Sequence, residues 1–179
     1  ASGEHSHAMN LWQHFAHAAG AGRVSLVGAL VEYVQKDGAD YDSICALNLV
    51  TENGLSGRCI QDVVTRPSRK WAVAQGTKGR IEWHCGRRAG EDAVDLISDS
   101  GEVETFHFPK TRPDDFIAEL KHIESHLKAG TSSQSGLALQ RGLDTMLLVA
   151  ASHASAQQQR GVLLNHEKGC RLEAIESAA

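Results

Sequence analysis

The sequence predicts an α+β fold: a mostly antiparallel open sheet with helices packed on one face and the other face used for oligomerisation. Strand-like segments form a block in the middle of the chain, and two amphipathic helical segments follow them as a second block. One of the strand segments is apolar on both of its sides. A chain of 179 residues with 41% hydrophobic residues suits one domain, which we expect to span residues 1–179.

The strand block is delimited by local turn signals. The long segment 23–36 is rich in Val and Leu, as strands are. Three strand pairs follow, with turns at Asn53-Gly54, at residues 76–79 and near Ser100-Gly101. The pairs cover residues 43–66, 70–85 and 92–108, so the middle of the chain is predicted to be an antiparallel meander.

The segment 23–36 also predicts a partner for the sheet. Val27, Ala29 and Val31 alternate with Leu26 and Leu30, so both of its faces are apolar. One face can meet the helices, and the other needs a further layer. A second copy of the chain is the simplest such layer, so we expect a homo-oligomer, either dimer or tetramer.

Helical periodicity occurs at the two ends of the chain. Residues 6–19 predict a short helix that Gly20 and Gly22 end. Residues 111–129 predict a second amphipathic helix, which Gly130 terminates, and residues 139–158 predict a third. Residues 162–164 predict a last short strand, and the polar tail 166–179 is expected to be less ordered.

Composition and missing motifs exclude several classes of protein. A net charge of -4 gives no electrostatic footprint for nucleic acid, and no apolar run reaches the length of a membrane span. The sequence has no glycine-rich phosphate loop and no nucleophile-elbow motif. Its four cysteines, none at C-x-x-C spacing, predict reduced core thiols in a cytoplasmic protein. They are Cys45, Cys59, Cys85 and Cys170.

The N-terminal segment SGEHSHAMNLWQHFAH (residues 2–17) holds four of the ten histidines. Three interpretations are open: a metal site, a proton-transfer site, or the start of a helix. His14 and His17 are one helical turn apart, as zinc ligands can be. No cysteine or carboxylate joins the four histidines at a familiar spacing, so we expect no metal there.

Three segments, in their order and spacing, resemble the C-terminal domain of the Gfo/Idh/MocA oxidoreductases. GTKGRIEW at 76–83 is similar to the strand-turn-strand motif of that family. DDFIAELKHIESHLKAG at 114–130 and GLALQRGLDTMLLVAASHAS at 136–155 are similar to its late helices. The resemblance extends from about Ser6 to Asn165.

The resemblance implies the substrate-binding and dimerisation half of an NAD- or NADP-dependent enzyme acting on a sugar, polyol or related carbohydrate by hydride transfer. In that family a preceding Rossmann domain binds the dinucleotide and supplies a lysine, and this sequence has no such domain. We therefore expect a piece cut from a longer enzyme rather than a natural remnant. The isolated chain should be inactive and should bind no cofactor.

The resemblance also answers the question of the histidines. The family carries a catalytic histidine in a D-x-x-x-H-x-x-D pattern, and His7 to Asn10 match its H-x-x-D part with Asn10 in place of aspartate. Gly3 stands where the first carboxylate is expected, and the adjacent Glu4 is its candidate substitute. The resemblance thus implies His7 as catalytic residue, with Glu4 and Asn10 as candidate substrate contacts. Trp12 is expected either at the rim of the substrate cleft, as a further candidate substrate contact, or in the core.

Two other functions stay open at this point. The chain could be a non-catalytic dimerisation or ligand-binding module, which Gly3 and Asn10 in place of carboxylates favour. It could also be a metal-dependent enzyme that uses the histidine cluster.

Overall fold

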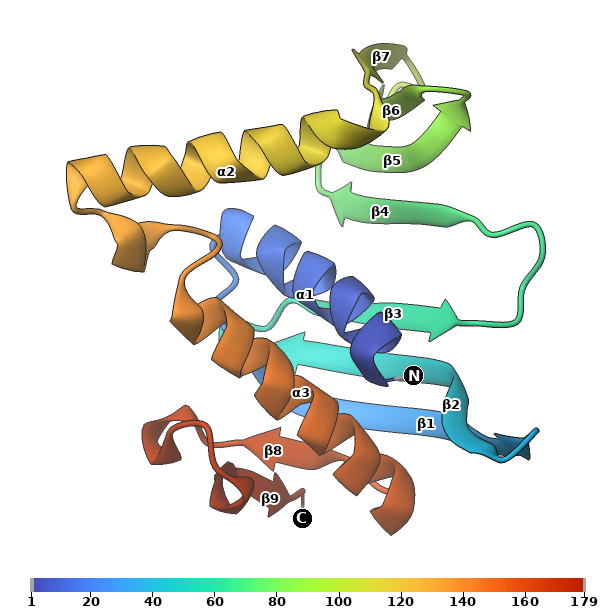
Figure 1. Ribbon diagram of the computed structural model, residues 1–179, viewed down its shortest axis with the longest axis vertical. Coiled ribbons are helices and arrows are strands. Elements are labelled where there is room, and N and C mark those ends of the chain that lie inside the picture. The colour runs from blue at the N-terminus through green and yellow to red at the C-terminus, as the bar shows by residue number, and fades with distance from the viewer. Residues whose placement is uncertain (1, 179) are drawn as a thin grey trace. The chain divides into compact units, whose positions relative to one another are not determined.

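The computed structural model describes residues 2–178 and has the predicted α+β class, with open, antiparallel sheets (Figure 1). Two compact units divide the chain: Ala1–Val64 with Thr131–Ala179, and Thr65–Gly130. The helices are α1 (Ser2–Ala18), α2 (Arg112–Ala129) and α3 (Leu139–Gln158). The strands are β1 (Val24–Lys36), β2 (Ala39–Thr51), β3 (Ser56–Asp62), β4 (Lys70–Gly76), β5 (Gly79–Arg88), β6 (Glu91–Ser98), β7 (Val103–Pro109), β8 (Val162–Leu164) and β9 (Ile175–Ser177).

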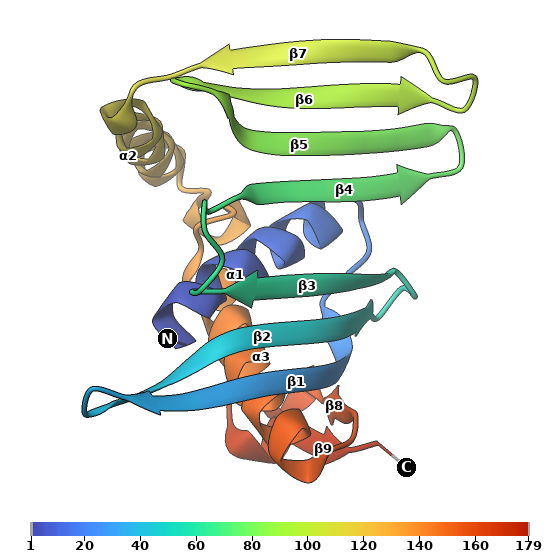
Figure 2. The ribbon, with the colours of Figure 1, turned by 90° about the vertical axis from the view of Figure 1, so that its right-hand side faces the viewer.

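The first unit is a five-stranded sheet with two helices on one face. Its strand order is β3-β2-β1-β8-β9, and α1 and α3 lie over the same side of β1 and β2 (Figures 1 and 2). The core between these layers is apolar, with Val27 and Leu49 of the sheet packed near Leu148 of α3. The prediction of helices on one face of the sheet is therefore confirmed for this unit.

The hairpin of β1 and β2 fixes which residues face the helices. Its two-residue turn, Asp37-Gly38, has positive φ at both positions (54° and 78°), which is the geometry that matches the twist of a hairpin. The register pairs Val27 with Leu49 and Leu30 with Ala46. Because strand side chains alternate, the second pair lies on the face that α1 and α3 leave open.

The C-terminal segment is more regular than its polar sequence suggests. It contains short 3₁₀ turns at His166–Lys168 and Leu172–Ala174, and strand β9 follows. β9 pairs with β8, with Leu164 opposite Ile175. Unlike the apolar residues 162–164, the residues of β9 (Ile, Glu and Ser) carry no apolar strand pattern that the sequence alone could show.

The second unit is a four-stranded antiparallel meander in the order β4-β5-β6-β7 (Figure 2). The register confirms the predicted turns at residues 76–79 and near Gly101. Its buried apolar side chains are Ala93 and Ile97 among the residues described there. Most of its large apolar side chains, Trp71 and Phe108 among them, are exposed. This unit therefore has little core of its own.

Helix α2 has well-formed ends but no buried residue. At its start the Asp114 carboxylate accepts hydrogen bonds from the Thr111 N–H and hydroxyl (2.6 and 2.9 Å), which lower the pKa of Asp114. Gly130, with φ 66°, ends the helix as predicted. Its apolar stripe, with Phe116 and Leu120, faces solvent. None of the described helices combines the length and the apolar character needed to cross a membrane.

The prediction of core thiols is correct for two of the four cysteines. Cys45 and Cys59 are buried, and burial raises their thiol pKa to about 12 and about 11. Cys85 is half-buried. Cys170 is exposed, with its thiol 3.3 Å from the Leu143 carbonyl oxygen, because it lies in the C-terminal turns rather than on a strand.

Candidate functional site

Helix α1 has one buried face and one polar face. His5, Met9, Gln13 and Ala16 recur every three or four residues, and all are buried against the sheet and α3. The helix ends at Ala18, and Gly20 (φ 70°) closes it through a hydrogen bond to the carbonyl of His17. The opposite face of α1 is therefore the part of this helix that is available to a ligand.

His7 and Glu4 lie on that polar face, and both are exposed. They are three residues apart, so their side chains are neighbours on the helix surface. The His7 ring makes no hydrogen bond or ion pair with the residues that the structure describes. Both ring nitrogens of His7 are thus available to a ligand.

Asn10 lies on the same face, one turn beyond His7, and is held by α3. Its amide nitrogen donates to the Thr145 hydroxyl oxygen (3.0 Å). Gln13 donates to the same oxygen (3.1 Å), and the Thr145 hydroxyl donates to the Arg141 carbonyl (3.0 Å). This contact leaves the Asn10 carbonyl oxygen as an acceptor for a hydroxyl group close to His7.

Trp12 lies on the other side of α1 from His7. Its indole packs on β3, where a Cβ added at Gly57 would come within 3.0 Å of the ring. It also packs against the core of the first unit. The structure therefore brings Glu4, His7 and Asn10 together on one helix face and does not bring Trp12 to them.

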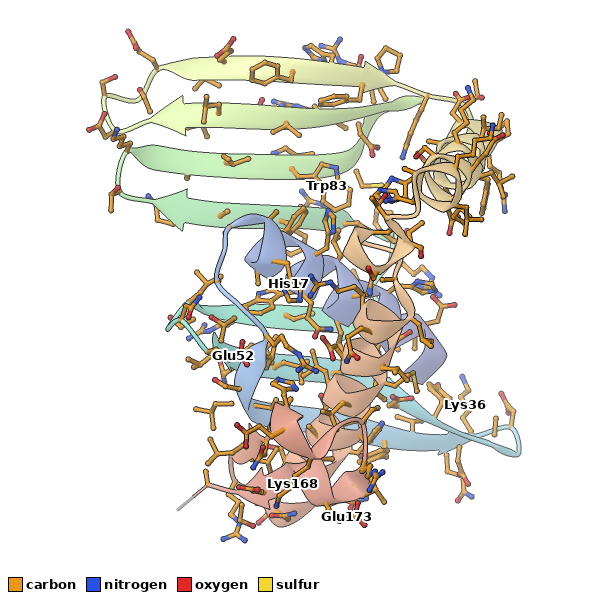
Figure 3. The ribbon with its side chains drawn as sticks, turned by 90° about the vertical axis from the view of Figure 1, so that its left-hand side faces the viewer. His17, Lys36, Glu52, Trp83, Lys168 and Glu173 are labelled. Atoms are coloured by element: carbon orange, nitrogen blue, oxygen red, sulfur yellow. The ribbon has the colours of Figure 1, made fainter. Side chains whose placement is uncertain are left out.

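The four N-terminal histidines have different surroundings. The His5 ring is buried, and its Nε2 donates to the Asp42 carbonyl (3.1 Å). The His17 ring, which Figure 3 labels, accepts from the Arg141 guanidinium (3.0 Å), and the charges of Arg23 and Asp144 also act on it. Burial and the Arg141 charge lower the pKa of His17. His14 and His7 are exposed.

Sequence reasoning missed a second group of titratable side chains in the first unit. The Tyr33 hydroxyl is 2.6 Å from His153 Nδ1, and His153 Nε2 is 4.0 Å from Asp42 Oδ2. The two rings also stack, with centroids 5.8 Å apart. Burial and the Asp42 charge raise the pKa of Tyr33. These residues come from β1, β2 and α3, so no local spacing in the sequence links them.

A third polar group lies in the second unit, on one face of β5 and β6. Glu82, His84 and Asp95 place their side-chain donor atoms within 4.8 Å of one another. Glu82 and His84 are two residues apart on β5, a spacing that puts both side chains on one face of a strand. That spacing was a visible signal, but Asp95 joins them only through the strand register.

A shallow groove of about 480 Å³ lies elsewhere on the first unit, at the edge of β1 beside the end of α3. Leu30, Asn48, Arg58 and Ile60 line it. None of Glu4, His7 and Asn10 lines this groove. The groove and the polar face of α1 are therefore separate surfaces of the first unit.

Sequence comparison and structural comparison give different results. No family model matches the sequence, and no curated protein matches it. Solved structures do resemble it, among them an aldose-aldose oxidoreductase from Caulobacter crescentus complexed with glycerol. That likeness has a TM-score of 0.65 at 18% identity and covers 85% of this chain and 46% of that chain.

Two further structures are similar. An oxidoreductase from Agrobacterium radiobacter in complex with NAD+, L-tartaric acid and magnesium gives a TM-score of 0.63 at 20% identity, over 80% of this chain and 44% of that one. An NAD-binding protein from Listeria innocua gives a TM-score of 0.54 at 15% identity, over 88% of this chain and 49% of that one. This chain thus has a fold found in two oxidoreductases and an NAD-binding protein, and it spans less than half the length of each of these three chains.

Proposed function

We propose that this chain is the substrate-binding and oligomerisation half of an NAD(P)-dependent oxidoreductase of the Gfo/Idh/MocA type. Its substrate would be a sugar, a polyol or a related carbohydrate. The observation that carries the proposal is the fold likeness to two oxidoreductases, which covers 80–85% of this chain but less than half of theirs. The exposed His7 on the polar face of α1 is a side chain that can transfer the proton of such a reaction.

The described residues do not fit a dinucleotide site of the Rossmann kind. That site needs parallel strands joined by a helix, with a glycine-rich turn at the helix start. Every strand pair between residues 2 and 178 is antiparallel. The dinucleotide would therefore be bound by another part of the enzyme, and its nicotinamide would exchange a hydride with the substrate carbon.

In this proposal His7 carries the proton of the reaction. Oxidation of an alcohol to a carbonyl releases a hydroxyl proton, and an imidazole is the side chain whose ordinary pKa is nearest neutrality. An exposed ring with both nitrogens unbonded can accept that proton from a substrate that is seated on α1. In the reverse direction the protonated ring returns it.

Asn10 and Glu4 would orient the substrate around His7. The Asn10 amide nitrogen is committed to Thr145, so its carbonyl oxygen is held in place to accept from a sugar hydroxyl. Glu4 can accept from a second hydroxyl on the other side of His7. We assign Trp12 a packing role instead, because it contacts β3.

The proposed oligomer uses the open face of the five-stranded sheet. Leu30 and Ile60 lie on this face and are 65% and 66% exposed, and Leu163 adds to them. Clusters of exposed apolar residues on a sheet are typical of protein–protein interfaces. A second copy of the chain would cover them. The cysteine pattern of the sequence supports a cytoplasmic location for this oligomer.

Calorimetric titration of the chain with NADH and NADPH tests whether the dinucleotide is bound by another part of the enzyme. We expect no detectable binding of either, and no oxidation of polyols in the presence of NAD+ or NADP+. Micromolar binding to this chain would contradict the proposal, because it would require a nucleotide site within residues 1–179. Turnover of any polyol by the chain alone would contradict it equally.

One observation favours a non-catalytic module as second candidate. Gly3 and Asn10 stand where carboxylates are expected, and Asn10 also serves to hold α1 on α3. In that case α1 would bind a ligand without moving a proton. Substitution of His7 by Gln in the complete enzyme separates the two functions. A binding module should keep its ligand affinity with an amide at this position, whereas a proton-transfer site should lose turnover.

A further inference from the structure

The polar group on the second unit has an arrangement that suits a metal ion. Glu82 and His84 project from the same face of β5, and the register places Asp95 of β6 directly opposite Glu82. His84 Nε2 lies 3.6 Å from Glu82 Oε2 and 3.7 Å from Asp95 Oδ2. Ligand atoms bound to zinc at about 2.1 Å lie ~3.4 Å apart. His84 Nε2 is close to this separation from both carboxylates, and all three donor atoms lie within 4.8 Å of one another.

The outer oxygen of each carboxylate is held by another side chain. Arg80 Nε donates to Glu82 Oε1 (2.6 Å), and the Thr105 hydroxyl donates to Asp95 Oδ1 (2.7 Å). Asp95 is only 5% exposed, so its position is fixed by packing as well. Such outer contacts orient first-shell ligands in metal sites. Here they turn Glu82 Oε2 and Asp95 Oδ2 toward His84.

We propose that Glu82, His84 and Asp95 bind one divalent transition-metal ion. One imidazole and two carboxylates form a nitrogen and oxygen donor set that suits Zn²⁺, Co²⁺ or Mn²⁺ better than the all-oxygen ions Mg²⁺ and Ca²⁺. Because only three protein side chains coordinate the ion, its remaining coordination positions are open to water or to a small molecule.

Arg87 competes with the metal ion. Its Nη1 lies 2.7 and 2.6 Å from the two oxygens of Asp95, so it neutralises that carboxylate in the metal-free chain. Its side chain is 43% exposed and can swing into solvent. Metal binding therefore requires Arg87 to leave Asp95 Oδ2. Removal of its guanidinium in Arg87→Ala should tighten metal binding.

Titration of the 179-residue chain with Co²⁺, followed by its visible absorption bands, tests this site. We expect one Co²⁺ per chain, displaced by Zn²⁺. Glu82→Gln and His84→Gln should each weaken binding at least tenfold, and Thr105→Val should weaken it less. The matched control is His107→Gln, because His107 pairs with Glu91 (2.9 Å) and belongs to no three-residue group among the described residues. This control should bind Co²⁺ as the wild type does.

A second variant, His7→Gln with His14→Gln, removes the exposed N-terminal histidines as adventitious ligands. Absence of Co²⁺ binding in the wild type would overturn the proposal. So would binding that survives His84→Gln and disappears in the N-terminal variant. Circular dichroism of each variant checks that the sheet is intact. The readout uses no enzyme activity, so this site and the proposed oxidoreductase function can fail separately.

Discussion

At the scale of single residues, the position of a histidine around α1 decides its chemistry. His5 and His7 are two residues apart, yet one ring is buried on the Asp42 carbonyl and the other is exposed. The helical period of 3.6 residues separates them by about half a turn. Of these two rings only that of His7 can meet a substrate, so His7 rather than His5 is proposed to transfer the proton.

Thr145 is predicted to join Asn10 to α3. Thr145→Val leaves the Asn10 and Gln13 amides without this acceptor and should lower the free energy of unfolding by about 1–3 kcal/mol. Urea unfolding of Thr145→Val, Asn10→Ala and the double variant measures the pairwise coupling. Additive effects of the two substitutions would contradict a direct contact.

His17 is predicted to make stability depend on pH. Burial and Arg141 lower its pKa in the folded chain, whereas the unfolded chain binds the proton near pH 6.5. Between these two values the unfolded state binds more protons, so stability is full above about pH 6.5 and falls as the pH falls below it. As the pH falls below about 6.5, the urea midpoint of unfolding should decrease less in His17→Gln than in the wild type.

The control for this experiment is His14→Gln, which replaces an exposed ring. It should retain the decrease of the wild type. An equal decrease in His17→Gln and the wild type would show that His17 does not carry the effect.

At the scale of elements, α2 and α3 share an amphipathic sequence but differ in burial. Leu148 of α3 is fully buried, whereas Leu120 of α2 is 67% exposed. Leu148→Ala should therefore cost about 2–5 kcal/mol of unfolding free energy. Leu120→Ala should change it by less than about 0.5 kcal/mol. Thermal unfolding of both variants checks the contrast. A large loss in Leu120→Ala would mean that α2 is covered in solution.

Local signals explain why most elements were predictable. The turn Asp37-Gly38, the turn near Gly101 and the end of α2 at Gly130 are all set by residues that tolerate positive φ. The helix ends and hairpins are therefore visible in the sequence. The division into two sheets was not, because it depends on which strands pair, and β1 takes its second neighbour from the distant β8. Strand β9 was missed because only Ile175 of its three residues is apolar.

The same limit applies to the candidate site. A motif in consecutive residues indicated His7 and Asn10, and the structure places both on one helix face. Trp12 was expected at the cleft rim or in the core, and its position on the helix turns it toward β3 and the core. Tyr33 and His153 were missed because 120 residues separate them in the chain.

At the scale of the whole molecule, exposed apolar surface on the sheet predicts self-association. Ile60→Lys places a charge on the open face of the five-stranded sheet and should shift the chain toward monomer in sedimentation velocity. The matched control is Leu139→Lys at the start of α3, where the leucine is 79% exposed. This control should keep the wild-type mass. A monomeric wild type, or equal effects of both variants, would contradict the proposed interface.

The NMR signals of the histidine rings test most directly whether a carbohydrate binds at His7. Addition of polyols such as glycerol and myo-inositol should shift the His7 ring signals saturably, while those of His107 in the second unit stay in place. Asn10→Ala should weaken the response. Saturable shifts at His153 without any at His7, or no shift at millimolar polyol, would contradict carbohydrate binding at His7.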